Sequence, residues 1–497
     1  MSLRKIRITL AAIFLAGLTL LFLDFTGTAH RFLGWMAKVQ ALEAILAINV
    51  IVIVALAAVT LIFGRIYCSV VCPLGVMQDI FGWLGRKARK NRYSYSPEVS
   101  WLRYAMLCLM VIAFIAGIGS IVQLLAPYSA FGRIATMLLQ PLWKLGNNML
   151  ASMAERADSY TFYSADVWMK SLPVFIIAIV TLAVLAVLAW RGGRTYCNTI
   201  CPVGTLLSFA ARHSWLKIQI DVDKCHNCSL CARNCKASCI DYKSHTVDYS
   251  RCVVCGDCIG KCKSGALKYA PTPMFSSAKN GNGQAKAASG DASRRAFLLG
   301  TGLAATAVLA QDKHVDGGLA AINAKQSPKR LTPLTPPGSL SAGNMARRCT
   351  GCQLCVSECP NDVLRPSTSL TSLMQPVMEY DRGYCRPECT RCSDVCPAGA
   401  IKPIDKEEKS SIQIGHAIVV VKECISAQGK DECGNCARHC PAGAITMVPT
   451  DKDDDLAPLV PAINEGACIG CGACEYVCPV RPLSAIHVEG HETHKHI

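Results

Sequence analysis

Residues 225–262 read CHNCSLCARNCKASCIDYKSHTVDYSRCVVCGDCIGKC, and the rest of the chain is organised around this stretch. It contains the spacing C-x2-C-x2-C-x3-C twice, from Cys225 to Cys235 and from Cys252 to Cys262. Three thiolates at this spacing can wrap one corner of a 4Fe-4S cube, while the fourth cysteine of each run reaches the other cube. The spacing predicts two clusters. Their ligands are Cys225, Cys228, Cys231 and Cys262 for one, and Cys252, Cys255, Cys258 and Cys235 for the other.

Zinc is the other metal that so many cysteines could bind. A zinc site closes on four ligands and has no use for eight cysteines in this interlocked order. Residues 216–270 are therefore expected to form a two-cluster α+β module of the bacterial-ferredoxin type. Lys236 and Lys263 stand where ferredoxins usually place proline, which changes the local turn but leaves the ligand count intact.

Four apolar stretches precede this module, and a helix needs about 20 residues to cross a bilayer. They are residues 6–23, 44–63, 104–126 and 172–190. Lys and Arg gather before the first stretch and between the second and third, so both ends of the unit are expected to face the cytoplasm. Residues 1–215 are thus predicted to form a polytopic α-helical domain in the inner membrane of a bacterium, with the first cluster pair cytoplasmic.

Two of the apolar stretches are followed by the same motif, Cys-x3-Cys-Pro. It places Cys68 with Cys72 and Cys197 with Cys201, each pair one helical turn apart and next to a proline that ends or kinks the helix. The repeat implies an internally duplicated two-span unit. These four cysteines are either a packing motif or a redox-active or docking element beside a quinol site, and spacing alone leaves both open.

Residues 271–345 have the Gly, Ala, Ser and Pro composition of a linker. Within them, residues 293–310 pair two arginines with a short apolar run, as in twin-arginine export signals. Export would make the following domain periplasmic, with the apolar run retained as a fifth anchor or cleaved near Ala305-Thr306-Ala307. The alternative is a short helix between two cytoplasmic modules.

Residues 346–490 contain four more cysteine quartets, and each ends in Cys-Pro. Insertions follow Cys385 and Cys424, so the first ligands of the second and third quartets are the less certain ones. A nested pairing, first with fourth and second with third, is the expectation for ligand exchange. The quartets are Cys349, Cys352, Cys355 and Cys359; Cys385, Cys389, Cys392 and Cys396; Cys424, Cys433, Cys436 and Cys440; and Cys468, Cys471, Cys474 and Cys478.

Several cysteines and histidines fall outside these patterns. Cys108 is expected to be a small apolar residue in a span, and Cys239 a spare beside the first quartet. The segments 400–402 and 444–447, which follow two quartets, are predicted to be short strands. The tail with His491, His494 and His496 could bind metal, but such ends are more often disordered.

Composition and charge exclude several other classes of protein. The 30 cysteines in 497 residues fall mostly into repeated quartets, which does not fit a secreted disulfide scaffold. The net charge of +16 comes from basic residues beside the spans and around the first cluster pair, so no nucleic-acid partner is expected. No histidine lies within a predicted span, so no haem held inside the bundle is expected either.

The motifs resemble those of a known family. The spans, the two Cys-x3-Cys-Pro repeats and the first cluster pair resemble the NapH/MauN-type membrane subunit. The last domain, with Tyr380-Asp381-Arg382-Gly383-Tyr384-Cys385 and Cys389-Thr390-Arg391-Cys392, is similar to the NapG/MauM type. In that family these are separate subunits of a quinol dehydrogenase, and this chain resembles a natural fusion of them. The flavin domain of the related nitrous-oxide regulator type is not expected, because the first span begins within ten residues of the start.

The resemblance implies electron conduction. Quinol would be the donor, about six 4Fe-4S clusters the path, and a reductase or electron-carrier protein the acceptor, with membrane lipid and the quinone pool as further partners. A second hypothesis is a maturation or assembly factor that supplies electrons while a partner enzyme is loaded with its cofactor. A third is a cytoplasmic conduit that takes electrons from a soluble ferredoxin.

Overall fold

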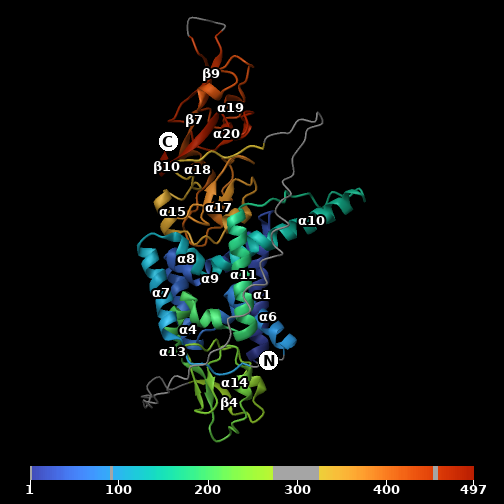
Figure 1. Ribbon diagram of the computed structural model, residues 1–497, viewed down its shortest axis with the longest axis vertical. Helices are drawn as coiled ribbons and strands as arrows, with labels where there is room; N and C mark the ends of the chain where they lie inside the picture. The colour runs from blue at the N-terminus through green and yellow to red at the C-terminus, as the bar shows by residue number, and fades with distance from the viewer. Residues whose placement is uncertain (1–2, 90–92, 272–323, 452–456) are drawn as a thin grey trace, which may run out of the picture.

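The computed structural model describes residues 3–89, 93–271, 324–451 and 457–497, and the signal-like segment 293–310 lies outside them. Figure 1 shows an elongated molecule with a helical unit in the middle. The module built from residues 216–271, here called the inner module, lies at one end of this unit. Residues 324–497, here called the outer domain, lie at the opposite end (Figure 1). The two sets of cysteine quartets are therefore separated by the whole length of the helical unit.

Four long apolar helices form the helical unit: α1 (Leu3–Leu23), α4 (Val50–Phe63), α7 (Ser100–Ile115) and α11 (Leu172–Gly192). Among the described residues, only α1 and α11 are long and apolar enough to cross a membrane alone. The helices α8 (Gly119–Leu125) and α9–α10 (Pro127–Glu155), bent by 79°, make up to a third candidate. Four complete spans are thus an expectation that the structure does not confirm.

Two of the expected spans are broken into two helices. The stretch 44–63 is interrupted at Ile48, whose φ is 54°, between α3 (Ala41–Leu46) and α4. Asn49 then caps α4, because its side-chain oxygen accepts a hydrogen bond from the Val52 amide at 3.3 Å. The stretch 104–126 is interrupted at Gly117, with φ 72°, between α7 and α8. Both breaks shorten the long helices α4 and α7 and change the direction of the chain.

Short helices fill the two ends of the helical unit. Toward the outer domain lie α2 (Thr28–Lys38), α3, α8, α9 (Pro127–Ile134) and the π-helix η1 (Ala135–Leu139). Toward the inner module lie α5 (Tyr67–Val70), α6 (Pro73–Arg89), α12 (Thr195–Thr199) and α13 (Pro202–Arg212), and α10 (Gln140–Glu155) projects sideways near the outer end (Figure 1). Each Cys-x3-Cys-Pro motif therefore lies at a joint between two of these short helices.

The inner module is a small α+β unit. Its strands β1 (Leu216–Ile220) and β4 (Leu267–Pro271) pair antiparallel, as do β2 (Ile240–Asp241) and β3 (Thr246–Val247). The helix α14 (Leu230–Asn234) and the 3-10 turn η2 (Ile259–Lys261) each lie within one cysteine quartet. The β1–β4 pair joins the start and the end of the module, on either side of the two quartets.

The outer domain repeats this design with three antiparallel strand pairs. They are β5 (Leu364–Pro366) with β6 (Pro376–Met378), β7 (Ile412–Val419) with β10 (Ile486–His496), and β8 (Ile445–Pro449) with β9 (Leu459–Ile463). The helices are α15 (Ala342–Arg348), α16 (Leu354–Glu358), α17 (Arg391–Asp394), α18 (Lys406–Ser411), the 3-10 turn η3 (Val421–Glu423), α19 (Asn435–Arg438) and α20 (Ala473–Val477). The predicted strand at 444–447 is confirmed by β8, whereas 400–402 forms no strand. The histidine-containing tail belongs to β10, so the expectation of a disordered end is wrong.

Candidate iron–sulfur centres and a four-cysteine site

The inner module brings its two quartets together. Cys258 lies close enough to Cys252, Cys255 and Cys235 to interact with all three electrostatically. Cys231 lies in the same way beside Cys225 and Cys228. The fourth cysteine of the first run thus lies beside the three thiols of the second run.

Cys239 was expected to be a spare cysteine, and the structure places it against this same set. It is 1% exposed, and its sulfur lies 3.5 Å from that of Cys235. A second thiol so close to a candidate ligand can hydrogen-bond its sulfur or replace it.

The outer domain pairs its quartets differently from the nested expectation. Cys355 lies within electrostatic reach of Cys349, Cys352 and Cys396, so the fourth cysteine of the second quartet joins the first quartet. A cavity lined by Cys359, Cys385, Cys389 and Cys392 completes the exchange. In the last two quartets, Cys471 lies near Cys468 and Cys440, and a further cavity is lined by Cys424, Cys433, Cys436 and Cys478. First therefore pairs with second, and third with fourth.

The expectation of a nested pairing is wrong because each two consecutive quartets fold into one compact unit. The two units meet where the Cys385 amide donates to the Cys471 carbonyl at 3.0 Å. The sequence left the first ligands of two quartets uncertain, because insertions follow Cys385 and Cys424. Each of these cysteines lines a cavity together with the second and third cysteines of its own quartet. The four sets form a row that leads away from the helical unit.

The arrangement of the thiols differs from that of a single-ion site. Among the described residues, no group of three or more His, Cys, Asp or Glu side chains is arranged to hold one metal ion. The ligands of a 4Fe-4S cube each bind a different iron, so they stand further apart than the ligands of one zinc ion. Backbone amides also point at these sulfurs, with Ala444 N at 3.2 Å from Cys440 Sγ and Gly351 N at 3.4 Å from Cys349 Sγ. The cysteine sets of both modules fit clusters.

The two Cys-x3-Cys-Pro motifs meet inside the helical unit. Cys72 lies within electrostatic reach of Cys197, Cys68 and Cys201, and all four are at most 5% exposed. Tyr67 and Tyr196, which precede the first cysteine of each motif, are buried beside them. Sequence analysis identified these residues but gave no sign that the two pairs form one site.

Two buried arginines cross between the motifs. Arg65 Nη2 donates to the Cys197 carbonyl at 3.2 Å, and Arg194 Nη1 donates to the Cys68 carbonyl. Gly75 and Gly204 make room for this exchange: a Cβ on Gly75 would lie 2.9 Å from Arg194 Nη1, and one on Gly204 would lie 2.7 Å from Arg65 Nη2. The arginine before each motif therefore bonds the first cysteine's carbonyl in the other motif. This reciprocal contact relates the two repeats by an approximate two-fold symmetry.

The inner module docks on this site through charged groups. Asp79 of α6 accepts from Arg7 Nη1 at 2.8 Å, Arg194 Nε at 2.7 Å and Lys236 Nζ at 2.7 Å. Arg65 Nη1 also donates to the Ser250 carbonyl at 2.8 Å. These contacts fix the second quartet of the inner module next to the four buried cysteines.

The outer domain docks on the opposite end, through the loop of its first quartet. Ser129 Oγ donates to the Gly351 carbonyl at 3.1 Å, and Gln123 Nε2 donates to the Cys349 carbonyl at 3.4 Å. Gly132 of α9 touches Cys352 so closely that a Cβ there would overlap the Cys352 carbonyl. The first outer cluster set is thus the one that lies nearest to the helical unit.

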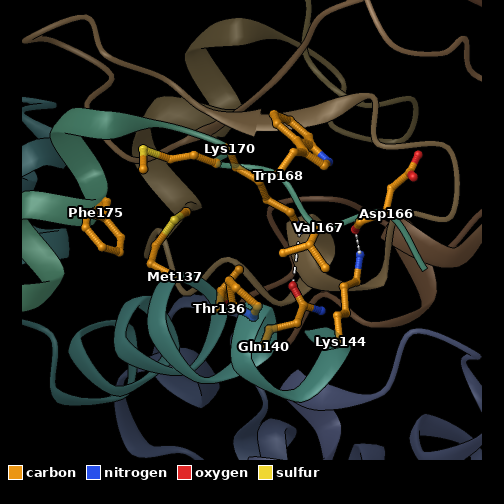
Figure 2. Close-up of a pocket in the computed structure, with 11 residues that line it drawn as sticks. Thr136, Met137, Gln140, Lys144, Asp166, Val167, Trp168, Lys170 and Phe175 are labelled. Carbon is orange, nitrogen blue, oxygen red and sulfur yellow. Dashed lines mark hydrogen bonds between the residues drawn. The ribbon is translucent and has the colours of Figure 1, made fainter. Parts of the chain in front are cut away.

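A cavity of about 240 Å³ lies beside this junction, between η1, α10, the start of α11 and the segment 166–170. Figure 2 shows Met137, Val167 and Phe175 around it, with Thr136, Gln140 and Lys170 among the polar lining residues. Lys170 Nζ donates to the Val356 carbonyl at 2.8 Å and to Gln140 Oε1 at 3.3 Å. Burial lowers the pKa of Lys170 to about 8, so its amine is mainly protonated at neutral pH. Lys170, which lines the cavity, therefore contacts the residue that follows the candidate ligand Cys355.

Comparison with known proteins agrees with this architecture. A family model described as a 4Fe-4S binding domain matches residues 46–92 and 172–221. A second model, described as a 4Fe-4S dicluster domain, matches residues 348–420 and 431–481. The first dicluster segment contains the first two quartets of the outer domain, and the second contains the last two quartets except Cys424. The protein is accordingly an iron–sulfur electron-transfer protein of the ferredoxin type.

Relatives with known names define the family more closely. The ferredoxin-type protein NapG of Escherichia coli is 33% identical over 179 residues, which are 33% of this chain and 75% of NapG. The methylamine utilization ferredoxin-type protein MauM of Methylobacillus flagellatus is 32% identical over 169 residues, 32% of this chain and 70% of MauM. MauN of Paracoccus denitrificans is 25% identical over 205 residues, 41% of this chain and 57% of MauN. The chain belongs to the NapG/MauM family of ferredoxin-type proteins, and its additional similarity to MauN is consistent with a fusion of the two types.

Proposed function

We propose that this protein is a membrane-bound quinol dehydrogenase component that passes electrons through six 4Fe-4S clusters to a reductase or electron-carrier protein. The proposed ligands are the eight cysteines of the inner module and the sixteen of the outer domain, in the sets described above. Oxidation of one quinol releases two electrons, which the clusters take up one at a time, and two protons, which leave to water. When bound, the clusters supply the one-electron chemistry, and the chain supplies their position and surroundings.

The arrangement of the helical unit supports a transmembrane position. Its long helices present large apolar side chains outward, among them Ile51 at 82% and Ile115 at 78% exposed. The helix α10 projects sideways with Leu142 and Met149 exposed, as expected for a helix lying along a membrane surface. We therefore propose that α1, α4, α7 and α11 cross the membrane, the shorter two with the help of the short helices. The inner module is then cytoplasmic, and the segment 293–310 exports the outer domain to the periplasm.

The proposal of quinol oxidation rests on the cavity beside Lys170. Its walls are mainly apolar, as a quinol ring and tail require. Two of the residues that line it, Thr136 and Trp168, have a side-chain polar atom, Oγ1 and Nε1, that is buried without a hydrogen-bond partner among the described residues. A quinol hydroxyl bound there would supply a partner. The ammonium of Lys170 favours loss of a hydroxyl proton from a quinol beside it. Its contact with the Val356 carbonyl links the cavity to the first outer cluster set.

Two variants test this proposal. Thr136→Val removes one hydrogen-bonding group at nearly constant volume, and Lys170→Met removes the cation. The rate at which a quinol analogue reduces the clusters, followed by low-temperature EPR on anaerobic protein, should fall about 2–10-fold for Thr136→Val, as expected for one hydrogen bond. We expect a larger loss for Lys170→Met.

Thr181→Val is the matched control, because the Thr181 hydroxyl donates within α11, to the Ile177 carbonyl at 2.7 Å. Reduction by dithionite confirms that every variant has kept its clusters. Quinol reduction at the wild-type rate in both Thr136→Val and Lys170→Met would refute the proposed site.

The exposed end of the inner module favours a second candidate function. Cys228 is exposed and Cys225 is partly exposed, so a soluble ferredoxin could deliver electrons to this cluster for assembly of a partner enzyme. Depleting the protein after the partner enzyme has matured separates the two functions. Loss of quinol-dependent activity supports steady conduction, whereas unchanged activity supports an assembly role.

A further inference from the structure

The two ferredoxin modules lie at opposite ends of the helical unit, and the four buried cysteines lie between them. On the inner side, Asn198 Nδ2 donates to the Ala237 carbonyl at 3.2 Å, which is two residues from Cys235. On the outer side, Tyr67 Oη donates to Gln40 Oε1 at 3.0 Å and accepts from the Ala41 amide at 3.1 Å. Glu43, two residues further on, lies beside Thr350 and Cys352 of the outer domain. A continuous series of packed groups thus connects the four cysteines to a candidate cluster on each side.

Each of the four sulfurs faces a hydrogen-bond donor. Gln78 Nε2 lies 3.2 Å from Cys197 Sγ, the Gly204 amide lies 3.4 Å from Cys201 Sγ, and Arg65 Nη2 lies 3.9 Å from Cys68 Sγ. The Gly75 amide bonds Cys72 in the position that Gly204 has in the second motif. Donors of this kind stabilise thiolates bound to iron and tune the potential of a cluster, and the quartets of the outer domain show the same backbone contacts.

The buried charges point to an anionic occupant. Arg65 is fully buried, and besides Cys68 Sγ it donates to Asn198 Oδ1 and the carbonyls of Ser250 and Cys197, with no carboxylate paired to it in the described part of the chain. Arg133, also fully buried, lies beside Tyr196 and bonds only the Gln123 carbonyl and Ser129 Oγ among the described residues. A buried cation without a counter-charge is costly. Four thiolates around an iron–sulfur core leave a net negative charge that offsets it.

The sequence comparison supports the same occupant. Each of the two segments matched by the 4Fe-4S binding model, 46–92 and 172–221, contains only two cysteines. Neither segment alone can supply the four thiolates of a cluster. The tertiary structure joins the two pairs into one set of four.

We infer that Cys68, Cys72, Cys197 and Cys201 hold one further iron–sulfur cluster, shared between the two repeats, which relays electrons between the inner module and the outer domain. The cluster accepts one electron from a neighbouring cluster and gives one electron to the next, so no bond is made or broken in the relay. Occupancy of this site does not depend on the proposed quinol reaction, whereas the relay role rests on the proposed electron-transfer function.

Iron content tests the occupancy. Anaerobically purified full-length protein should contain iron and sulfide for one cluster more than the six of the two modules, counted by chemical analysis and Mössbauer spectroscopy. The double variant Cys68→Ser, Cys197→Ser should lose one cluster and keep the spectra of the other six. Cys108→Ser is the matched control, since Cys108 is an exposed lone cysteine of α7, and it should lose none.

Wild-type protein with iron for only six clusters overturns the inference, even if the double variant fails to insert. A Cys68–Cys72 or Cys197–Cys201 disulfide found by mass spectrometry in anaerobic protein overturns it as well. Seven clusters without reduction by a quinol analogue would leave this site intact and refute only the quinol reaction.

Conduction across a membrane tests the relay. Proteoliposomes with ferricyanide inside and dithionite outside should lose ferricyanide absorbance through the wild type and the Cys108→Ser variant. The double variant should slow this loss at least about 10-fold. Equal rates in all three samples would refute the relay.

Discussion

The contact between Gly132 and Cys352 gives a sharp test of how the outer domain is docked. Gly132 lies in α9, and a Cβ there would overlap the Cys352 carbonyl oxygen, lie 3.1 Å from the carbonyl carbon and lie 3.0 Å from Phe22 Cζ. The first two of these atoms belong to the backbone of the quartet loop, which cannot turn away as a side chain would. Gly132→Ala must therefore push the loop of the first outer quartet away from the helical unit.

The size of the effect follows from the packing of the added methyl group. Alanine in place of a mid-helix glycine stabilises the helix by about 0.5–1 kcal/mol, but α9 is present in the docked and undocked states alike, so this term does not change the docking equilibrium. Inserting a methyl group into a tightly packed contact costs about 1–3 kcal/mol, and a backbone neighbour favours the upper half of that range. The docked state should lose about 2–3 kcal/mol relative to the undocked state, which is about a 30–150-fold shift of the equilibrium.

Amide hydrogen exchange of residues 349–359 measures this shift, because the loop must open locally to exchange. Gly146→Ala is the matched control: Gly146 lies in α10, and a Cβ there would meet nothing within 4 Å. We expect faster exchange in Gly132→Ala by about 30–150-fold and no change in Gly146→Ala. Equal protection of the loop in both variants would show that the docking described here is wrong.

Two further predictions concern stability. Asp79→Asn leaves Arg7 and Arg194 without their carboxylate, and Lys236 keeps only its contact with Asp257 at 3.4 Å. It should lower the free energy of unfolding by about 3–5 kcal/mol, whereas the surface variant Asp158→Asn should change it by less than about 0.5 kcal/mol; similar denaturation midpoints for the two variants would contradict this. Burial lowers the pKa of His494, whose Nε2 lies 3.0 Å from Thr335 Oγ1, to about 4. Between pH 6.5 and 4 the unfolded state therefore binds more protons than the folded state. The stability that His494 contributes, at most about 3 kcal/mol, is present above its unfolded pKa of about 6.5 and is lost as the pH falls toward 4. His494→Gln should flatten the stability profile of the outer domain in that window, and an unchanged slope would refute the assignment.

Local spacing was enough to identify the chemistry of this protein. The six quartets and the two Cys-x3-Cys-Pro motifs are defined over a few residues, and thiolates at such spacing have few alternative uses. The same local rules located the long helices, since apolar runs need no knowledge of their neighbours. The sequence also contains local signals for the two helix breaks, Asn49 and Gly117, although the breaks were not predicted.

The association of distant segments was decided only by the tertiary structure. No local rule says that Cys396 joins the first outer quartet rather than the last, because the exchange depends on which units fold against each other. Ile48 adopts a positive φ that β-branched residues avoid, although its side chain is exposed. The turn there is closed by the Asn49 amide, which donates to the Ala44 carbonyl at 2.9 Å. The four buried cysteines come from motifs more than a hundred residues apart, and it is the exchange of Arg65 and Arg194 between the motifs that joins them. The sequence by itself predicted the candidate ligands, and the packing of distant segments determined which of these cysteines lie together.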